Sequence, residues 1–351
     1  MTDETPASDR PSPRTGTEPV EAKWSAPGAV PAVDARGLVK TFGTNRAVDG
    51  IDLVVHEGQI LGVLGPNGAG KTTMLQMLAT LLPIDSGSAT IFGHDVQRQP
   101  HAVRQLIGVT GQYSSVDELL TGRENLRLFG WLQGLSSTEA RSIGDDLLER
   151  FDLTDAADRY VMHYSGGMRR RLDLAASLMT RPALIFLDEP TTGLDPRTRG
   201  QMWETIRALV ADGCTILLTT QYLDEADQLA DRIAVIDRGR KVAEGTSAEL
   251  KAQVGGSSLQ VQLADGVDAR AASAVAGEVA HHAPIISPTG TGFTISLSDA
   301  TQAADVLIAL RHGNLDIVNA SIEQPTLDEV FMALTGHPGS TSSLDLEATA
   351  A

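Results

Sequence analysis

A glycine-rich segment between an apolar run and a helical pattern constrains this chain more than any other feature. Ile60 to Leu64 is typical of a buried strand, and Lys71 to Leu82 of a helix. The residues that join them are Gly65, Pro66, Asn67, Gly68, Ala69, Gly70, Lys71 and Thr72. They match the pattern G-x-x-x-x-G-K-S/T, in which glycines let backbone N–H groups turn toward phosphate oxygens and the helix adds its positive dipole end. We therefore predict a strand, loop and helix that bind the phosphate chain of a nucleotide.

The first helical residues after this loop carry the expected phosphate and metal chemistry. Lys71 supplies a mobile positive charge to the β and γ phosphates, and the Thr72 hydroxyl is placed to ligate the Mg²⁺ that bridges them. Thr73 is expected to line the same site. The alternative is a glycine-rich turn without a ligand, and the Lys-Thr pair in register between a strand and a helix argues against it.

A second motif is an apolar strand, Ala183 to Leu187, that runs into two carboxylates, Asp188 and Glu189. Because a buried strand holds its terminal side chains rigidly, we expect Asp188 to hold Mg²⁺, directly or through water. Glu189 is the candidate general base that polarises the attacking water. A helix cap or a solvated turn is the alternative, which the position of the acid pair after a phosphate loop disfavours.

The 351 residues allow about two domains with tails. Strands alternate with helical patterns from Val33 to about Val254, and the periodicity is helical throughout between Arg123 and Met179, which predicts an α/β sheet with an inserted all-helical subdomain. A smaller α+β pattern comes last, with strands expected at 259–263, 293–297 and 317–322 and helices at 269–279, 303–312 and 327–334. The expected boundaries are 1–31 for a disordered lead, 32–254 for the ATP-binding domain, about 113–180 for the helical subdomain, 258–337 for the α+β domain and 338–351 for a flexible tail.

The composition excludes several classes of protein. With 28 basic and 45 acidic residues the formal charge is -17, so we expect no nucleic-acid partner and assign Arg169 to Arg171 to a solvated or intersubunit face. His281 and His282 lack acidic or thiol neighbours for a metal site, and the single Cys214 suits a reducing compartment. We find neither a signal peptide nor a run of about 18 apolar residues, so a membrane role requires another chain to cross the bilayer.

The segment Tyr164-Ser165-Gly166-Gly167-Met168 resembles the signature motif L-S-G-G-Q of ABC ATPases, and it stands between the two other motifs in the order typical of that family. The resemblance implies a P-loop NTPase of the ABC-ATPase fold that hydrolyses MgATP in a dimer. In the family, Ser165, Gly166 and Gly167 would cap the ATP held by a second copy of the chain. A plain helix cap is the alternative for this motif.

Further positions match the same family. Phe42 stands where an aromatic ring stacks on adenine, and Gln112 where a glutamine senses Mg²⁺ and contacts the membrane subunit. Asp195, in Gly193-Leu194-Asp195, matches the aspartate that communicates across the dimer. The signature departs from the family at Tyr164 and Met168.

The family's switch histidine is replaced by Gln221. A glutamine amide can donate to a γ-phosphate oxygen but cannot carry a proton, so hydrolysis should be slower or less sensitive to pH. A dead site is the competing interpretation, and the presence of Lys71, Thr72, Asp188 and Glu189 argues for a working one.

The run Thr219 to Asp227 together with Leu327 to His337 resembles the daunorubicin/doxorubicin-resistance ATP-binding subunits. The resemblance implies a peripheral protein on the cytoplasmic side of the cell membrane that energises efflux of a hydrophobic drug or lipid-like molecule through a separate multi-helix permease. A non-transport ABC ATPase or a nucleotide-gated regulatory module is the alternative. From its residues alone, Leu327 to His337 is a capped amphipathic helix, with Thr326 as N-cap and an end at Gly336.

Overall fold

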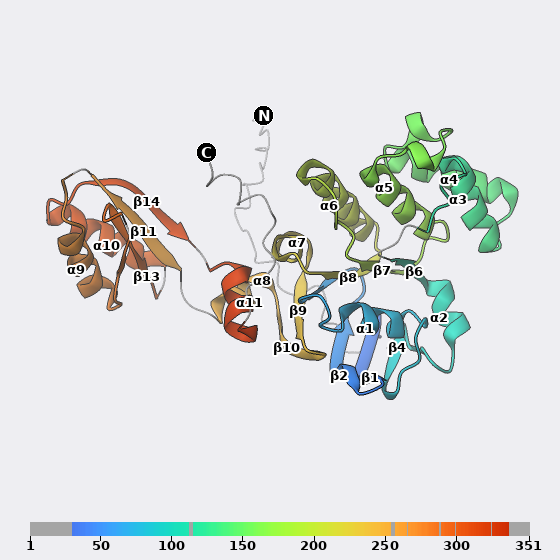
Figure 1. Ribbon diagram of the computed structural model, residues 1–351, viewed down its shortest axis with the longest axis horizontal. Coiled ribbons are helices and arrows are strands. Elements are labelled where there is room, and N and C mark those ends of the chain that lie inside the picture. The colour runs from blue at the N-terminus through green and yellow to red at the C-terminus, as the bar shows by residue number, and fades with distance from the viewer. Residues whose placement is uncertain are drawn as a thin grey trace, which may run out of the picture.

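The computed structural model describes residues 30–111, 115–253, 257–264, 266–287, 289–298, 300–323 and 325–336. Most of the predicted lead, Gln112 and the predicted tail at 338–351 lie outside the described residues. The N-terminal domain, residues 30–253, occupies one end of an elongated molecule and the C-terminal sheet the other (Figure 1). The fold-class prediction is confirmed, whereas the exact domain boundaries stay predictions.

A six-stranded sheet in the order β10-β9-β3-β8-β7-β6 forms the centre of the N-terminal domain. All neighbours are parallel except the edge strand β10. The strands are β3 (Ile60–Leu64), β6 (Ile107–Thr110), β7 (Leu184–Asp188), β8 (Thr215–Thr220), β9 (Arg232–Asp237) and β10 (Arg240–Gly245). Every residue of β3, β7 and β8 is buried, which explains their nearly continuous apolar sequence. The helices beside this sheet are α1 (Lys71–Leu78), α2 (Pro100–Leu106), α6 (Pro196–Ala211), α7 (Leu223–Leu229) and α8 (Ser247–Ala252).

A second sheet, antiparallel and in the order β2-β1-β4-β5, packs against the first with α1 in the shared core. Its strands are β1 (Val33–Phe42), β2 (Asn45–Val55), β4 (Ser86–Ile91) and β5 (His94–Asp95). The expected alternation of strand and helix is therefore wrong at residues 33–55, because a short turn pairs Phe42 with Asn45 and sends the chain straight back. Helix α1 is also shorter than the predicted Lys71 to Leu82, and Thr80 adopts a left-handed φ of 62° just after it.

The inserted subdomain is helical from Gly122 to Ser177. Its elements are α3 (Gly122–Leu132), α4 (Ser137–Arg150), the short 3₁₀ turns η1 (Thr154–Ala156) and η2 (Val161–His163), and α5 (Gly166–Ser177). Capping boxes begin α3 and α4: Thr121 and Ser136 each accept a backbone N–H from the glutamate three residues later. These caps fix the residues at which the two helices begin.

The C-terminal domain is a four-stranded antiparallel sheet in the order β12-β13-β11-β14, with α9 and α10 packed on it. Its elements are β11 (Ser258–Leu263), α9 (Ala269–Ala280), β12 (Ile285–Ile286), β13 (Gly292–Ser296), α10 (Ala300–His312) and β14 (Ile317–Glu323). The sequence pattern missed only the two-residue β12, which is too short to show a period.

The last helix, α11 (Leu327–Thr335), leaves this sheet and packs on the N-terminal domain beside α7 and α8. Its apolar face consists of Leu327, Val330 and Phe331, which join one core with Leu223 and Leu250 of that domain. Thr326 and Gly336 cap the helix as predicted. Within the described ranges, no helix is both long enough and apolar enough to cross a bilayer.

Phe331→Ala should lower the free energy of unfolding by about 3–5 kcal/mol, because Phe331 is 3% exposed in the core that joins α11 to the N-terminal domain. Urea unfolding followed by tryptophan fluorescence measures the change. Met332→Ala is the matched control, since Met332 is 51% exposed on the same helix and should change stability by less than about 0.5 kcal/mol. Equal losses in the two variants would contradict this packing.

Candidate functional site

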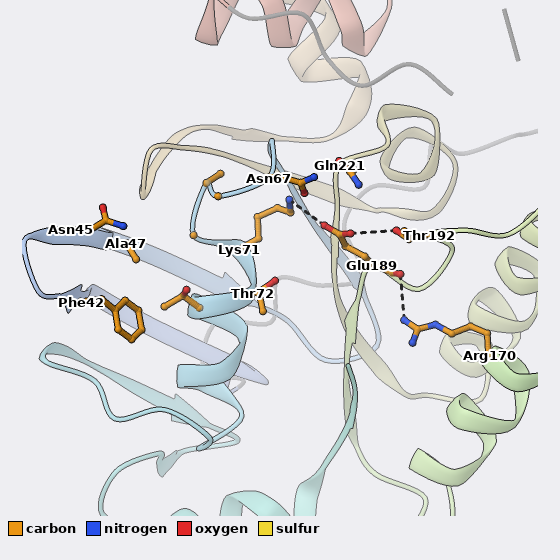
Figure 2. Close-up of a pocket in the computed structure, with 14 residues that line it drawn as sticks. Phe42, Asn45, Ala47, Asn67, Lys71, Thr72, Arg170, Glu189, Thr192 and Gln221 are labelled. Atoms are coloured by element: carbon orange, nitrogen blue, oxygen red, sulfur yellow. Dashed lines mark hydrogen bonds and ion pairs between the residues drawn. The ribbon is translucent and has the colours of Figure 1, made fainter. Parts of the chain in front are cut away.

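A cavity of about 800 Å³ opens where the loop between β3 and α1 meets the carboxyl ends of β7 and β8 (Figure 2). Ligands bind at this edge of parallel sheets because loops and helix N-termini converge there. The lining residues are Phe42, Asn45, Ala47, Asn67, Gly68, Ala69, Gly70, Lys71, Thr72, Thr73, Arg170, Glu189, Thr192 and Gln221. The cavity thus gathers residues from three separate sequence motifs.

The Lys71 side chain crosses the phosphate loop, and its ammonium is almost fully buried. Its Nζ donates to the carbonyl oxygens of Gly65 at 2.8 Å and Pro66 at 3.1 Å. The Glu189 Oε1 lies 3.5 Å away. Burial lowers the pKa of Lys71 and the nearby Glu189 carboxylate opposes this shift. A nucleotide phosphate would therefore meet a desolvated ammonium held at the cavity wall.

Two glycines allow the phosphate loop to pack against neighbouring backbone. A Cβ on Gly70, whose φ is 103°, would lie 2.2 Å from the carbonyl oxygen of Ala47. A Cβ on Gly65 would lie 2.2 Å from the carbonyl oxygen of Ile236. No side chain fits at either position, whereas Gly68 faces open space with a φ of 79°. The loop is thus wedged between β2 and β9 while its open side faces the cavity.

The two carboxylates at the end of β7 lie in different surroundings. Asp188 accepts hydrogen bonds at Oδ1 from the Thr72 hydroxyl at 3.1 Å and from the Thr219 hydroxyl. Glu189 adopts a left-handed φ of 48°, its backbone N–H donates to the Thr219 carbonyl, and its Oε2 accepts from the Thr192 hydroxyl at 3.3 Å. The turn at Glu189 aims its carboxylate at Lys71 and the cavity.

The adjacent hydroxyl and carboxylate oxygens of Thr72 and Asp188 are of the kind that Mg²⁺ prefers. In the part of the chain that the structure describes, no group of three or more His, Cys, Asp or Glu side chains is arranged to hold a metal ion. A Mg²⁺ here would therefore take most of its ligands from phosphate and water oxygens, as the ion commonly does.

Two family models match the chain. One, described as "ABC transporter", covers residues 48–192, and the other, "ATP-binding protein DrrA1-3-like, C-terminal domain", covers residues 245–335. The daunorubicin/doxorubicin resistance ATP-binding protein DrrA of Streptomyces peucetius is 52% identical over 318 residues, which are 90% of this chain and 95% of the relative. The chain belongs to the DrrA family of ABC transporter ATP-binding proteins. It is an ATPase.

Other relatives agree with this assignment. The doxorubicin resistance ATP-binding protein DrrA of Mycobacterium tuberculosis is 43% identical over 88% of this chain and 94% of its own length. A solved ATP-binding subunit of an ABC transporter superposes with a TM-score of 0.58 at 27% identity, covering 63% of this chain and 92% of that one. A dimeric ATP-binding cassette with bound ADP and Pi gives 0.56 at 25% identity, covering 61% and 98%.

The remaining predicted residues of this DrrA-family protein lie at or beyond the edge of the cavity. Phe42 is 49% exposed at the open side, with the Lys40 ammonium 5.8 Å from its ring centroid, and Gln221 lies opposite, near Asn67. Their predicted contacts with adenine and γ-phosphate stay predictions. Gln112 lies outside the described residues.

The signature motif and Asp195 do not line this cavity. The Ser165 hydroxyl caps α5 by accepting from the N–H of Met168, and Asp195 caps α6 by accepting from the N–H of Thr198. A Cβ on Gly167 would lie 2.4 Å from the Thr198 Cγ2, so the two helix starts are in tight contact. The signature motif thus lies outside the chain's own cavity, at the contact between the starts of α5 and α6.

Our assignment of Arg169 to Arg171 to one solvated or intersubunit face is wrong for Arg170 and Arg171, whose side chains are only 13% and 14% exposed. The Arg170 side chain reaches the cavity wall. The sequence analysis also missed Asn45, Ala47 and Thr192. Thr192 could have been predicted from its position three residues after Glu189, because the turn brings its hydroxyl to the Glu189 carboxylate. Asn45 and Ala47 reach the cavity only through the pairing of β1 with β2, which the sequence pattern did not indicate.

Gln221→His should add an ionisation to the pH profile of ATP hydrolysis, because an imidazole titrates near pH 6.5 and the native amide does not. We expect the kcat of the variant to change across about pH 5.5–7.5 with a shape that the native enzyme lacks, and nucleotide affinity to stay within about twofold. Steady-state phosphate release at fixed ionic strength measures both. Superimposable profiles for the two proteins would contradict a chemical role for Gln221.

Proposed function

We propose that two copies of this chain enclose MgATP, and that its hydrolysis drives export of a hydrophobic drug or lipid-like molecule through a separate multi-helix permease. The chain would then act as a peripheral protein on the cytoplasmic face of the cell membrane. The observation that carries the proposal is the match to resistance ATP-binding proteins along 90% of the chain, which includes the C-terminal domain. A match to the ATP-binding domain alone would support only ATP hydrolysis and not drug export.

Each cavity residue has a role in this proposal. Lys71 and the N–H groups of the loop hold the β and γ phosphates, and Thr72 and Asp188 hold Mg²⁺, which would neutralise charge on the phosphate oxygens. Glu189 accepts a hydrogen bond from the attacking water and orients it toward the γ-phosphate. Gln221 donates to a γ-phosphate oxygen, and Phe42 stacks on adenine at the open side.

The partner copy completes the site. Ser165, Gly166 and Gly167 begin α5, a helix whose free N–H groups and positive dipole end suit an anion, yet they lie outside their own chain's cavity. We propose that they cap the γ-phosphate held by the other copy, with Asp195 beside them. A solved cassette dimer in a post-hydrolysis state supports this arrangement.

Glu189→Gln should lower the kcat of ATP hydrolysis about 10²- to 10⁴-fold, because the amide cannot accept the proton of the attacking water. The same variant should accumulate as a dimer with MgATP, since bound ATP is no longer consumed. Phosphate release and light scattering measure the two effects. A Glu189→Gln protein that stays monomeric at saturating MgATP, alone and with its permease, would contradict the shared site.

Transport is tested in inside-out vesicles that contain the chain and a candidate multi-helix permease. Addition of MgATP should drive doxorubicin into the vesicles, measured as quenching of its fluorescence. Vesicles that carry Glu189→Gln provide the matched control, because the permease and the bound nucleotide are the same. Equal uptake with the two proteins would contradict ATP-driven export.

A further inference from the structure

Arg170 joins the helical subdomain to the catalytic end of the central sheet. The residue lies in the second turn of α5, and its guanidinium points away from solvent toward the end of β7 (Figure 2). It donates to four backbone carbonyl oxygens, those of Gly111 at 2.6 Å, Asp188 at 2.9 Å, Pro190 at 3.0 Å and Glu189 at 3.3 Å. One side chain therefore contacts two core segments that are 77 residues apart in sequence.

Asp173, one turn further along α5, completes this junction. Its side chain is 1% exposed, and its Oδ2 lies 3.5 Å from the Arg170 guanidinium. Its Oδ1 accepts a hydrogen bond from the N–H of Ser115 at 2.7 Å. Arg170 and Asp173 thus bind the carbonyl of Gly111 and the amide of Ser115, the described residues on either side of positions 112–114.

The carbonyls that Arg170 binds flank the most strained residue of the site. Glu189 has a φ of 48°, a conformation that costs free energy for a residue with a Cβ and persists only where neighbours hold it. Arg170 binds the carbonyl oxygens of Asp188 and Glu189, which are the peptide groups before and after the Glu189 Cα. These bonds fix both peptide planes and, through them, the direction of the Glu189 side chain.

We propose that Arg170 is a positioning residue for ATP hydrolysis, which transmits the position of the signature helix α5 to the carboxylate of Glu189. The proposal rests on the role of Glu189 as the general base. Helix α5 begins at the signature glycines. When these glycines contact a phosphate of the nucleotide held by the partner chain, the position of α5 changes, and Arg170 on α5 holds the peptide groups around Glu189. A lysine cannot replace this arginine. The planar guanidinium places several N–H donors against the carbonyls of both core segments, whereas a single ammonium cannot reach both.

The test compares Arg170→Lys and Arg170→Gln with the native chain. Both variants should lower kcat roughly 10- to 100-fold, as expected when a reacting group is misplaced by about 1 Å. The Kd of a fluorescent ATP analogue should stay within about twofold, because the phosphate loop and Lys71 are untouched. Steady-state phosphate release and equilibrium titration measure the two quantities.

Arg123→Lys is the matched control, because Arg123 is also a partly buried arginine of the helical subdomain and its partners Asp145 and Asp158 belong to the same subdomain. It should keep native kcat within about twofold. Comparable losses of kcat in Arg123→Lys, or a loss of nucleotide affinity in Arg170→Lys as large as its loss of kcat, would reduce Arg170 to a general structural role and overturn the proposal. A native kcat in Arg170→Lys would overturn it too.

Hydrogen exchange separates this proposal from the role of Glu189 itself. In Arg170→Gln the amides of residues 189–194 should exchange at least about tenfold faster than in the native chain without nucleotide, while peptides of β3 keep native rates. Should Glu189→Gln retain turnover, the base assignment fails, yet the exchange result still reports whether Arg170 holds the turn. Unchanged exchange at 189–194 would overturn the positioning role whatever the turnover.

Discussion

The Lys71 ammonium and the Glu189 carboxylate face each other across 3.5 Å with almost no access to water, and the rest of the site depends on this pair. Two buried charges are tolerated only when each is paired and hydrogen-bonded. Lys71 therefore also binds the carbonyls of its own loop, and Glu189 also binds Thr192. These contacts hold the phosphate loop against the end of β7 and keep the cavity wall in place.

The parallel sheet makes this pairing possible. Because β3, β8 and β7 are neighbours with one direction, their carboxyl ends meet at a single edge. The glycines at 65 and 70 let the phosphate loop approach β9 and β2 more closely than any side chain would permit. Close backbone contact on one side leaves the other side of the loop facing the cavity.

Apolar cores and one polar contact join the appended parts to the central sheet. Arg170 and Asp173 bind the helical subdomain to the catalytic edge through backbone groups, which sense position rather than side-chain identity. Helix α11 binds the C-terminal domain to α7 and α8 through Leu327, Val330 and Phe331. The helical subdomain is thus joined to the sheet by an apolar core and by this polar contact at the catalytic edge, whereas α11 packs through apolar side chains.

The sequence by itself determined the local chemistry of this protein: the phosphate loop, the acid pair, the signature glycines and, outside residues 33–55, the alternation of strands and helices. Each depends on residues within one turn or strand, where spacing dictates geometry. Only the tertiary structure decided the antiparallel pairing of β1 with β2 and β4, the place of Asn45 and Ala47 at the cavity, and the inward direction of Arg170. Strand pairing and the burial of a charged side chain depend on partners that are distant in sequence, such as Gly111 for Arg170, so no local pattern contains them.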